Sequence, residues 1–302
     1  MPNVFYGMNN RLANTYRFTK ATINGNTIDY TYPIAFSKNT YDEFLLGKYE
    51  ANIDKNDKYL VFSARKTGQN FLTVILYDIE NNTVLLTKDM TNIPWYKEDI
   101  QGNFIVNSSG SNQIFDWVSI SPLGTYILIN WQDEPNNANE GIRASIYQYD
   151  KSMNFIRKLA DHANHGDMGL DASSKEVYVQ FGFGNDRNNV SNRAIWSYPL
   201  DGTSRIQLLP SKYNGGHISC RNTNLKNWCY LSTSAEGYKE VFAVKLDGSA
   251  VVNRFAQTHF TSDSLHGDGA NVSVSPDGKK VLFYSNWREV NGIWDTYHVE
   301  FK

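Results

Sequence analysis

The residues that could do chemistry gather in the second half of the chain, where histidines recur beside turns. His165 lies in NHGDMGLD, His217 in GGHISCRN and His266 in LHGDGANV, and the fragment His-Gly-Asp occurs at both His165 and His266. Imidazole is a common choice for proton transfer and for metal binding, because its charge changes near neutral pH. Histidines at one repeated position therefore predict a shared site. The alternative is that each one hydrogen-bonds a neighbouring sheet as a structural group.

Both cysteines of the chain lie close to His217, in the stretch GGHISCRNTNLKNWCYLS. The turn-rich NTNLKN predicts a hairpin that places Cys220 and Cys229 on paired strands. Two thiolates and two imidazoles suffice for a closed tetrahedral zinc site, so we expect a structural zinc held by His217, Cys220, Cys229 and His266. Strict alternation puts His217 and Cys220 on opposite faces of a strand, which makes Cys220 the least secure ligand. A cross-strand disulfide and two unlinked buried thiols are the alternatives.

An internal repeat predicts the elements that must position these residues. The segments SPLGTYILINW from Ser121 and SPDGKKVLFYSNW from Ser275 match, and related segments start at Asp54, Leu170 and Cys220. The spacing fits a repeat of roughly 50 residues, each with four short strands, which is typical of propeller blades. The sequence therefore predicts an all-β fold.

We expect one β-propeller domain over residues 1–302, with six or seven blades of four antiparallel strands. Residues 92–113 read as an insertion, and a β-sandwich is the alternative fold. In a propeller the first strand of each blade lines the central channel and starts at one mouth. The histidines at positions 165, 217 and 266 should then converge on one rim.

Composition narrows the class of partner. The formal net charge is -2, which argues against a broad nucleic-acid-binding surface. No apolar stretch is long enough for a membrane span, and the first residues do not resemble a secretory signal. We expect a monomer with no nucleic-acid or membrane partner. We also expect it to be secreted or periplasmic, with any export signal outside this sequence.

Three segments together resemble the propeller polysaccharide lyases, most closely the ulvan lyases. They are HGDMGLDASSKEVYVQF, GGHISCRNTNLKNWCYLS and SPDGKKVLFYSNW, and the resemblance covers the chain from about residue 115 onward. The SPDG turn is shared by TolB-like propellers generally, whereas GHISCRN with its WCY strand is more particular. The resemblance implies a lyase that cleaves a uronic-acid-containing anionic polysaccharide by β-elimination.

Such a reaction needs a base for the C5 proton, positive charge for the uronate carboxylate and an acid for the leaving oxygen. By resemblance, His165 is the base or its partner, Arg221 clamps the carboxylate and Tyr213 is the acid, with Tyr198 as its nearest rival. Arg221 could instead cap the turn that it opens, and Tyr213 could be an ordinary strand-end aromatic. Lesser candidates are Lys212 and Arg187 as cations, and Trp117 and Trp131 as stacking surfaces or core residues.

A propeller fold does not by itself decide function. The alternative to a lyase is a non-catalytic propeller that binds carbohydrate or a protein partner. A hydrolase on the same fold is weaker, because the sequence has no GxSxG elbow.

Overall fold

A computed structural model of the chain describes fourteen segments, with side chains left undescribed in some strands. They are residues 4–9, 14–46, 53–68, 72–91, 94–98, 104–109, 115–131, 145–161, 163–182, 193–213, 215–234, 239–261, 270–288 and 294–300. Within them the regular structure is β-strand, apart from the short 3₁₀ helix η1, Ser211–Tyr213. The same residues include no helix with the length and hydropathy to cross a membrane.

The chain divides into two compact units, Met1–Lys158 and Leu159–Lys302. The expectation of a single domain over residues 1–302 is not tested by this division and stays a prediction. The sheets of each unit are antiparallel and follow chain order.

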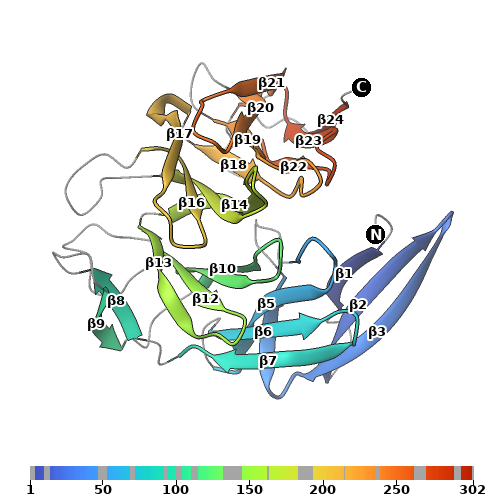
Figure 1. Cartoon of the computed structure of the whole chain (residues 1–302). Coiled ribbons are helices and arrows are strands. Elements are labelled where there is room, and N and C mark those ends of the chain that lie inside the picture. The colour runs from blue at the N-terminus through green and yellow to red at the C-terminus, as the bar shows by residue number, and fades with distance from the viewer. Residues whose placement is uncertain are drawn as a thin grey trace. The chain divides into compact units, whose positions relative to one another are not determined.

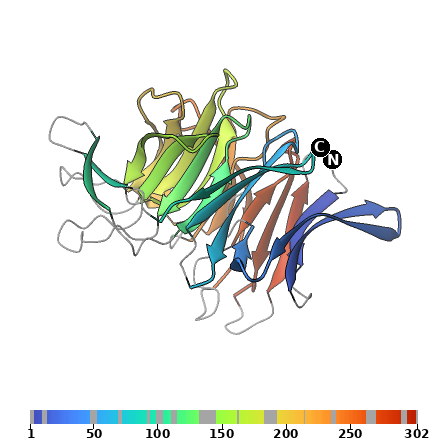
Figure 2. The same cartoon turned by 90° about the horizontal axis from the view of Figure 1, so that it is seen from below.

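The first unit begins with a three-stranded sheet whose second and third strands form a long hairpin, drawn in blue in Figures 1 and 2. A four-stranded sheet, a separate two-stranded sheet and the sheet β10–β13 follow, the last strand of which runs three residues past the unit boundary. The strands are β1 (Val4–Asn9), β2 (Thr15–Asn24), β3 (Thr27–Ser37), β4 (Tyr41–Leu45), β5 (Tyr59–Lys66), β6 (Thr73–Asp78), β7 (Thr83–Asp89), β8 (Pro94–Glu98), β9 (Phe104–Ser109), β10 (Phe115–Ile120), β11 (Tyr126–Trp131), β12 (Ser145–Asp150) and β13 (Phe155–Asp161).

The second unit contains two four-stranded sheets and one three-stranded sheet, β14–β17, β18–β21 and β22–β24. The strands are β14 (Ala163–Leu170), β15 (Glu176–Gly182), β16 (Ala194–Pro199), β17 (Ile206–Pro210), β18 (Gly216–Ser219), β19 (Trp228–Thr233), β20 (Glu240–Lys245), β21 (Val252–Gln257), β22 (Val272–Val274), β23 (Lys280–Ser285) and β24 (Asp295–Glu300). The first strands β14, β18 and β22 lie next to one another in chain order (Figure 1).

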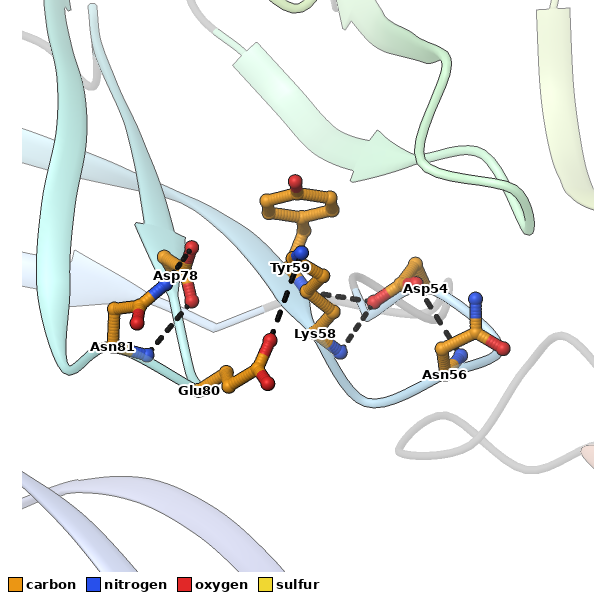
Figure 3. Close-up of polar contacts among 7 residues, drawn as sticks. All are labelled: Asp54, Asn56, Lys58, Tyr59, Asp78, Glu80 and Asn81. Atoms are coloured by element: carbon orange, nitrogen blue, oxygen red, sulfur yellow. Dashed lines mark hydrogen bonds and ion pairs between the residues drawn. The ribbon is translucent and has the colours of Figure 1, made fainter.

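One polar side chain holds the first turn of four of the repeats. The Asp54 carboxylate accepts hydrogen bonds from the backbone N–H groups of Lys58 (2.7 Å) and Tyr59 (2.6 Å), as Figure 3 shows. The Ser121 hydroxyl accepts one from the N–H of Tyr126 at 2.9 Å. Equivalent pairs in the second unit are Asp171 with Lys175 and Ser275 with Lys280. Short polar side chains that bond the backbone a few residues on are the chemistry of a tight turn. The repeat seen in the sequence is therefore a repeat of turn geometry.

A second contact in Figure 3 joins the two turns at the same end of the β4–β7 sheet. Lys58 lies 3.6 Å from the Glu80 carboxylate, and Asp78 accepts the backbone N–H of Asn81 at 2.9 Å. Both Lys58 and Glu80 are solvent-exposed, so this ion pair contributes little to stability.

Alternating apolar side chains fill the core between successive sheets. In the first unit, Val61 and Leu76 of the β4–β7 sheet pack with Ile127 and Tyr149 of the β10–β13 sheet. In the second unit, buried residues of the β14–β17 sheet pack with those of the β18–β21 sheet, among them Val179, Phe181, Leu231 and Phe242. A sheet covered on both faces needs such apolar surfaces on each side.

These sheets confirm the predicted architecture. The chain is an all-β, six-bladed β-propeller whose described blades are mostly four-stranded antiparallel sheets. The expectation of an insertion at residues 92–113 also holds, because β8 and β9 pair with each other and stand outside the blade sheets.

Candidate functional site

The candidate site lies on two neighbouring first strands of the second unit, β14 and β18. A bulge in β14 sets its geometry. Ala163 pairs with Gly182 and Gly166 with Gln180, so three steps along β14 oppose two along β15. Such a bulge re-aims the side chains around it.

His165 and His217 contact each other. Their ring centroids are 4.4 Å apart, and the ring planes are tilted by 53°. His217 is buried, with 7% of its surface exposed, whereas His165 is only partly buried. Burial, together with the nearby His165, lowers the pKa of His217 to about 3. His217 is therefore a neutral imidazole at pH 7.

Asp167, two residues after His165, ties the two strands together. Its carboxylate accepts hydrogen bonds from the backbone N–H of Cys220 at 2.8 Å and from the N–H of Met168 at 2.7 Å. It also accepts the Nε–H of Arg221 at 3.1 Å, in an ion pair whose two side chains are 4% and 15% exposed. Three donors on one buried carboxylate satisfy its charge. The end of β18 is thus fixed against β14.

Two glycines let β14 pack this closely. A Cβ at Gly166 would lie 2.4 Å from the Tyr178 hydroxyl and 2.6 Å from the Val179 carbonyl oxygen. A Cβ at Gly169 would lie 2.8 Å from the Cβ of Cys220. Real side chains essentially never approach so closely, so both positions in HGDMGL require glycine. Tyr178 consequently lies beside the backbone next to His165.

The cysteines correct the expected zinc ligands. Cys220 and Cys229 form a disulfide across the β18–β19 hairpin, and both are buried. A disulfide has no thiolate to offer a metal, so the predicted ligation by Cys220 and Cys229 is wrong for this oxidised form. The disulfide alternative is the one observed. Within the described ranges, no group of three or more His, Cys, Asp or Glu side chains could hold a metal ion.

Tyr213 has partners on the outer strands of its own blade. It lies in η1, its ring packs 5.6 Å from that of Phe242, and its hydroxyl accepts a hydrogen bond from Arg254 at 3.0 Å. Arg254 is on β21, three strands from β18, a separation of roughly 14 Å at ordinary strand spacing. Arg254 also pairs with the buried Glu240 at 3.1 Å. The Tyr213 network therefore belongs to the outer strand of its blade.

The rival Tyr198 also has partners in its own sheet. Its hydroxyl accepts hydrogen bonds from Gln180 at 3.3 Å and from Arg205 at 3.1 Å. The Arg205 guanidinium in turn stacks over the Trp196 ring at 4.0 Å. Tyr198 is thus held on β16, one strand beyond Tyr178.

The other predicted residues are placed as follows. His266 and Arg187 lie outside the described residues. Lys212 is exposed, with its Nζ 5.0 Å from the Tyr213 ring centre. Trp117 and Trp131 are buried core residues, so their stacking role is not supported.

Comparison with known proteins gives a fold and no closer relationship. No protein-family model matches the sequence, and neither does any curated protein. Among solved structures, TolB from Acinetobacter baumannii aligns with a TM-score of 0.50 at 16% identity, over 97% of this chain and 60% of that one. The chain has a TolB-like six-bladed propeller fold. It spans 60% of the length of that TolB chain.

Two further similar structures are a putative TolB from Agrobacterium tumefaciens and a chain of the Mitotic Checkpoint Complex. The first has a TM-score of 0.49 at 16% identity and covers 90% of this chain and 85% of its own. The second has a TM-score of 0.44 at 10% identity, and the alignment covers 95% of this chain and 87% of that one.

Sequence reasoning missed two residues of the site. Asp167 belongs to the His-Gly-Asp fragment that occurs twice in the sequence. This repetition indicates that the aspartate has a structural or functional role beside the histidine. Tyr178 stands in an ordinary alternating strand, EVYVQF, and no local pattern marks it. Its place beside Gly166 depends on the pairing of β14 with β15.

Proposed function

We propose that this TolB-like propeller is a polysaccharide lyase that cleaves a uronic-acid-containing, ulvan-like anionic polysaccharide by β-elimination. The observation that carries the proposal is the contact of His165 and His217 on neighbouring first strands, beside the Arg221–Asp167 ion pair. Successive side chains on one face of a strand are about 7 Å apart. His165 lies two residues before Asp167, the partner of Arg221, so a proton-transfer group and a cation come from the same part of these two strands.

In the proposed reaction His165 removes the C5 proton. The electrons of the C5–H bond form the C4=C5 double bond, and the C4–O bond to the leaving sugar breaks. His165, which carries the abstracted proton, returns it to the leaving oxygen, the role that the sequence suggested for Tyr213. Neutral His217 supports this cycle, because a second positive charge beside His165 would oppose protonation of the base.

Arg221 supplies positive charge for the uronate carboxylate, on which negative charge builds as the proton leaves. Preorganised charge of this kind is usually the largest contribution to such catalysis. The Nε–H of Arg221 donates a hydrogen bond to Asp167, and this bond fixes the plane of the Arg221 guanidinium. A fixed planar group suits recognition of a carboxylate.

A non-catalytic role in binding carbohydrate or a protein partner is the second candidate. The Arg221–Asp167 ion pair favours this non-catalytic role, because a guanidinium bonded to a buried carboxylate also holds two blades together. In that case the histidine pair would be part of the packing between first strands.

We also infer that the protein works outside the cytoplasm, in the periplasm or the extracellular medium, as a monomer. The disulfide supports this inference, because disulfides persist in oxidising compartments.

The test is an absorbance assay on ulvan and other uronate polymers, which follows the ultraviolet band of the new C4=C5 double bond. The lyase proposal predicts this band for at least one polymer, and its loss in His165→Ala. His298→Ala, a substitution of an exposed histidine on β24, should leave the rate unchanged. Polymer binding without the band from any substrate would favour the non-catalytic alternative, and full activity of His165→Ala would refute the assignment of the base.

A further inference from the structure

The disulfide removes two of the four ligands expected for zinc, yet the structure brings together a different pair of metal-binding side chains. The ring centroids of His165 and His217 are 4.4 Å apart. Two imidazoles that share one ion, each with a metal–nitrogen bond of about 2.1 Å, have ring centres roughly 5 Å apart. A small rotation of the less buried partner, His165, covers this difference.

The backbone around the pair is already fixed in place. Asp167 bonds the N–H of Cys220, and the disulfide closes the hairpin that carries His217. Ligands held by their surroundings lose little conformational freedom when they bind an ion.

We propose that His165 and His217 together bind a late first-row transition-metal ion, of the class of Zn²⁺, Ni²⁺ and Cu²⁺. Imidazole nitrogen suits these ions, with Cu²⁺ the tightest of the three. Two protein ligands among the described residues leave further positions for water, so the ion exchanges with solvent. The proposed site is therefore not a structural metal site.

This inference goes beyond the proposed lyase activity. An ion on the ring nitrogen of His165 occupies the lone pair that would accept a proton. A metal at this site therefore inhibits the reaction, and binding can be measured whether or not the protein is a lyase.

The experiment is isothermal titration calorimetry of the metal-stripped, oxidised protein with Zn²⁺, repeated with Ni²⁺. We expect one equivalent to bind, with an affinity reduced by roughly tenfold or more in His165→Ala and in His217→Ala, since changes to outer partners of a metal alone cost about that much. The control His298→Ala should bind like the unaltered protein. Wild-type affinity in His165→Ala would overturn the proposal, as would the absence of binding to the unaltered protein.

A second variant separates this site from one made by thiolates. Cys220→Ala/Cys229→Ala keeps both histidines and should retain the bound equivalent. Loss of binding in this variant, with binding kept in His165→Ala, would assign the metal to the cysteines and contradict the inference. Circular dichroism of each variant confirms that it is folded.

Discussion

The sheets β10–β13 and β14–β17 share a framework and differ in the strand that opens them. Both turn after the first strand through one polar side chain, Ser121 in the former and Asp171 in the latter. Yet β10 contributes Val118 and Ile120 to an apolar core, whereas β14 carries His165 and the buried Asp167. The turns therefore specify the blade, and the opening strand is where this chain places its reactive groups.

The largest expected effect comes from removing the disulfide, a link that the β10–β11 hairpin lacks. Cys220→Ala/Cys229→Ala should lower the free energy of unfolding by about 3 kcal/mol, because the unfolded chain regains the entropy of a short closed loop. Urea denaturation of both proteins under non-reducing conditions measures the difference. Equal midpoints with equal slopes would show that the disulfide does not constrain this blade.

Gly166→Ala tests the tight packing of β14. The new methyl would meet the Tyr178 hydroxyl and the Val179 carbonyl, and overpacking of this kind costs about 2 kcal/mol. Gly7→Ala is the matched control, because no atom lies within 4 Å of the added carbon there. Thermal unfolding of the two variants should separate them clearly, and equal losses would count against the close approach of β15.

The buried histidine makes stability depend on pH. The pKa of His217 is about 3 in the folded protein against an ordinary 6.5, so the unfolded state binds more protons between these values and stability falls as the pH drops through this window. From pH 7 to pH 5 the free energy of unfolding should fall by about 2 kcal/mol from this group. His217→Gln should remove that part of the dependence, which urea denaturation at both pH values can measure. An unchanged pH dependence in the variant would contradict the burial of His217.

The smallest effect concerns the shared framework. Ser121→Ala and Asp171→Ala each remove the acceptor that holds a turn, and each should cost about 1 kcal/mol. Similar losses in the two variants, measured by thermal unfolding, would sharpen the view that the blades have equivalent turns. A much larger loss in one of them would mean that its turn has a further structural task.

The framework could be predicted because its signals are local. A serine or aspartate at the start of a turn and an apolar strand after it recur at a regular spacing, as at Asp54 and Ser275. A propeller of six or seven blades follows from that repeat, and so does the placing of His165 and His217 at one end of neighbouring first strands. The N-terminal sheet carries no clear copy of the pattern, and its hairpin β2–β3 could not be anticipated in detail.

The chemistry of the site was less predictable, because it depends on contacts between strands. The sequence favours a zinc site for the cysteines at positions 220 and 229, and it also permits a disulfide or two unlinked buried thiols. Only the hairpin geometry decides between them. Tyr213 was chosen for its nearness to His217 along the chain, but η1 directs its hydroxyl to Arg254 on the outer strand.

The most direct test of the central claim is a nuclear magnetic resonance measurement on the histidine side chains, labelled with nitrogen-15, across pH 4 to 8. We expect a nuclear Overhauser contact between the rings of His165 and His217, with His217 neutral throughout the range. Absence of that contact, or a His217 that titrates near its ordinary pKa of 6.5, would contradict the paired site on which the proposed lyase and the proposed metal both depend.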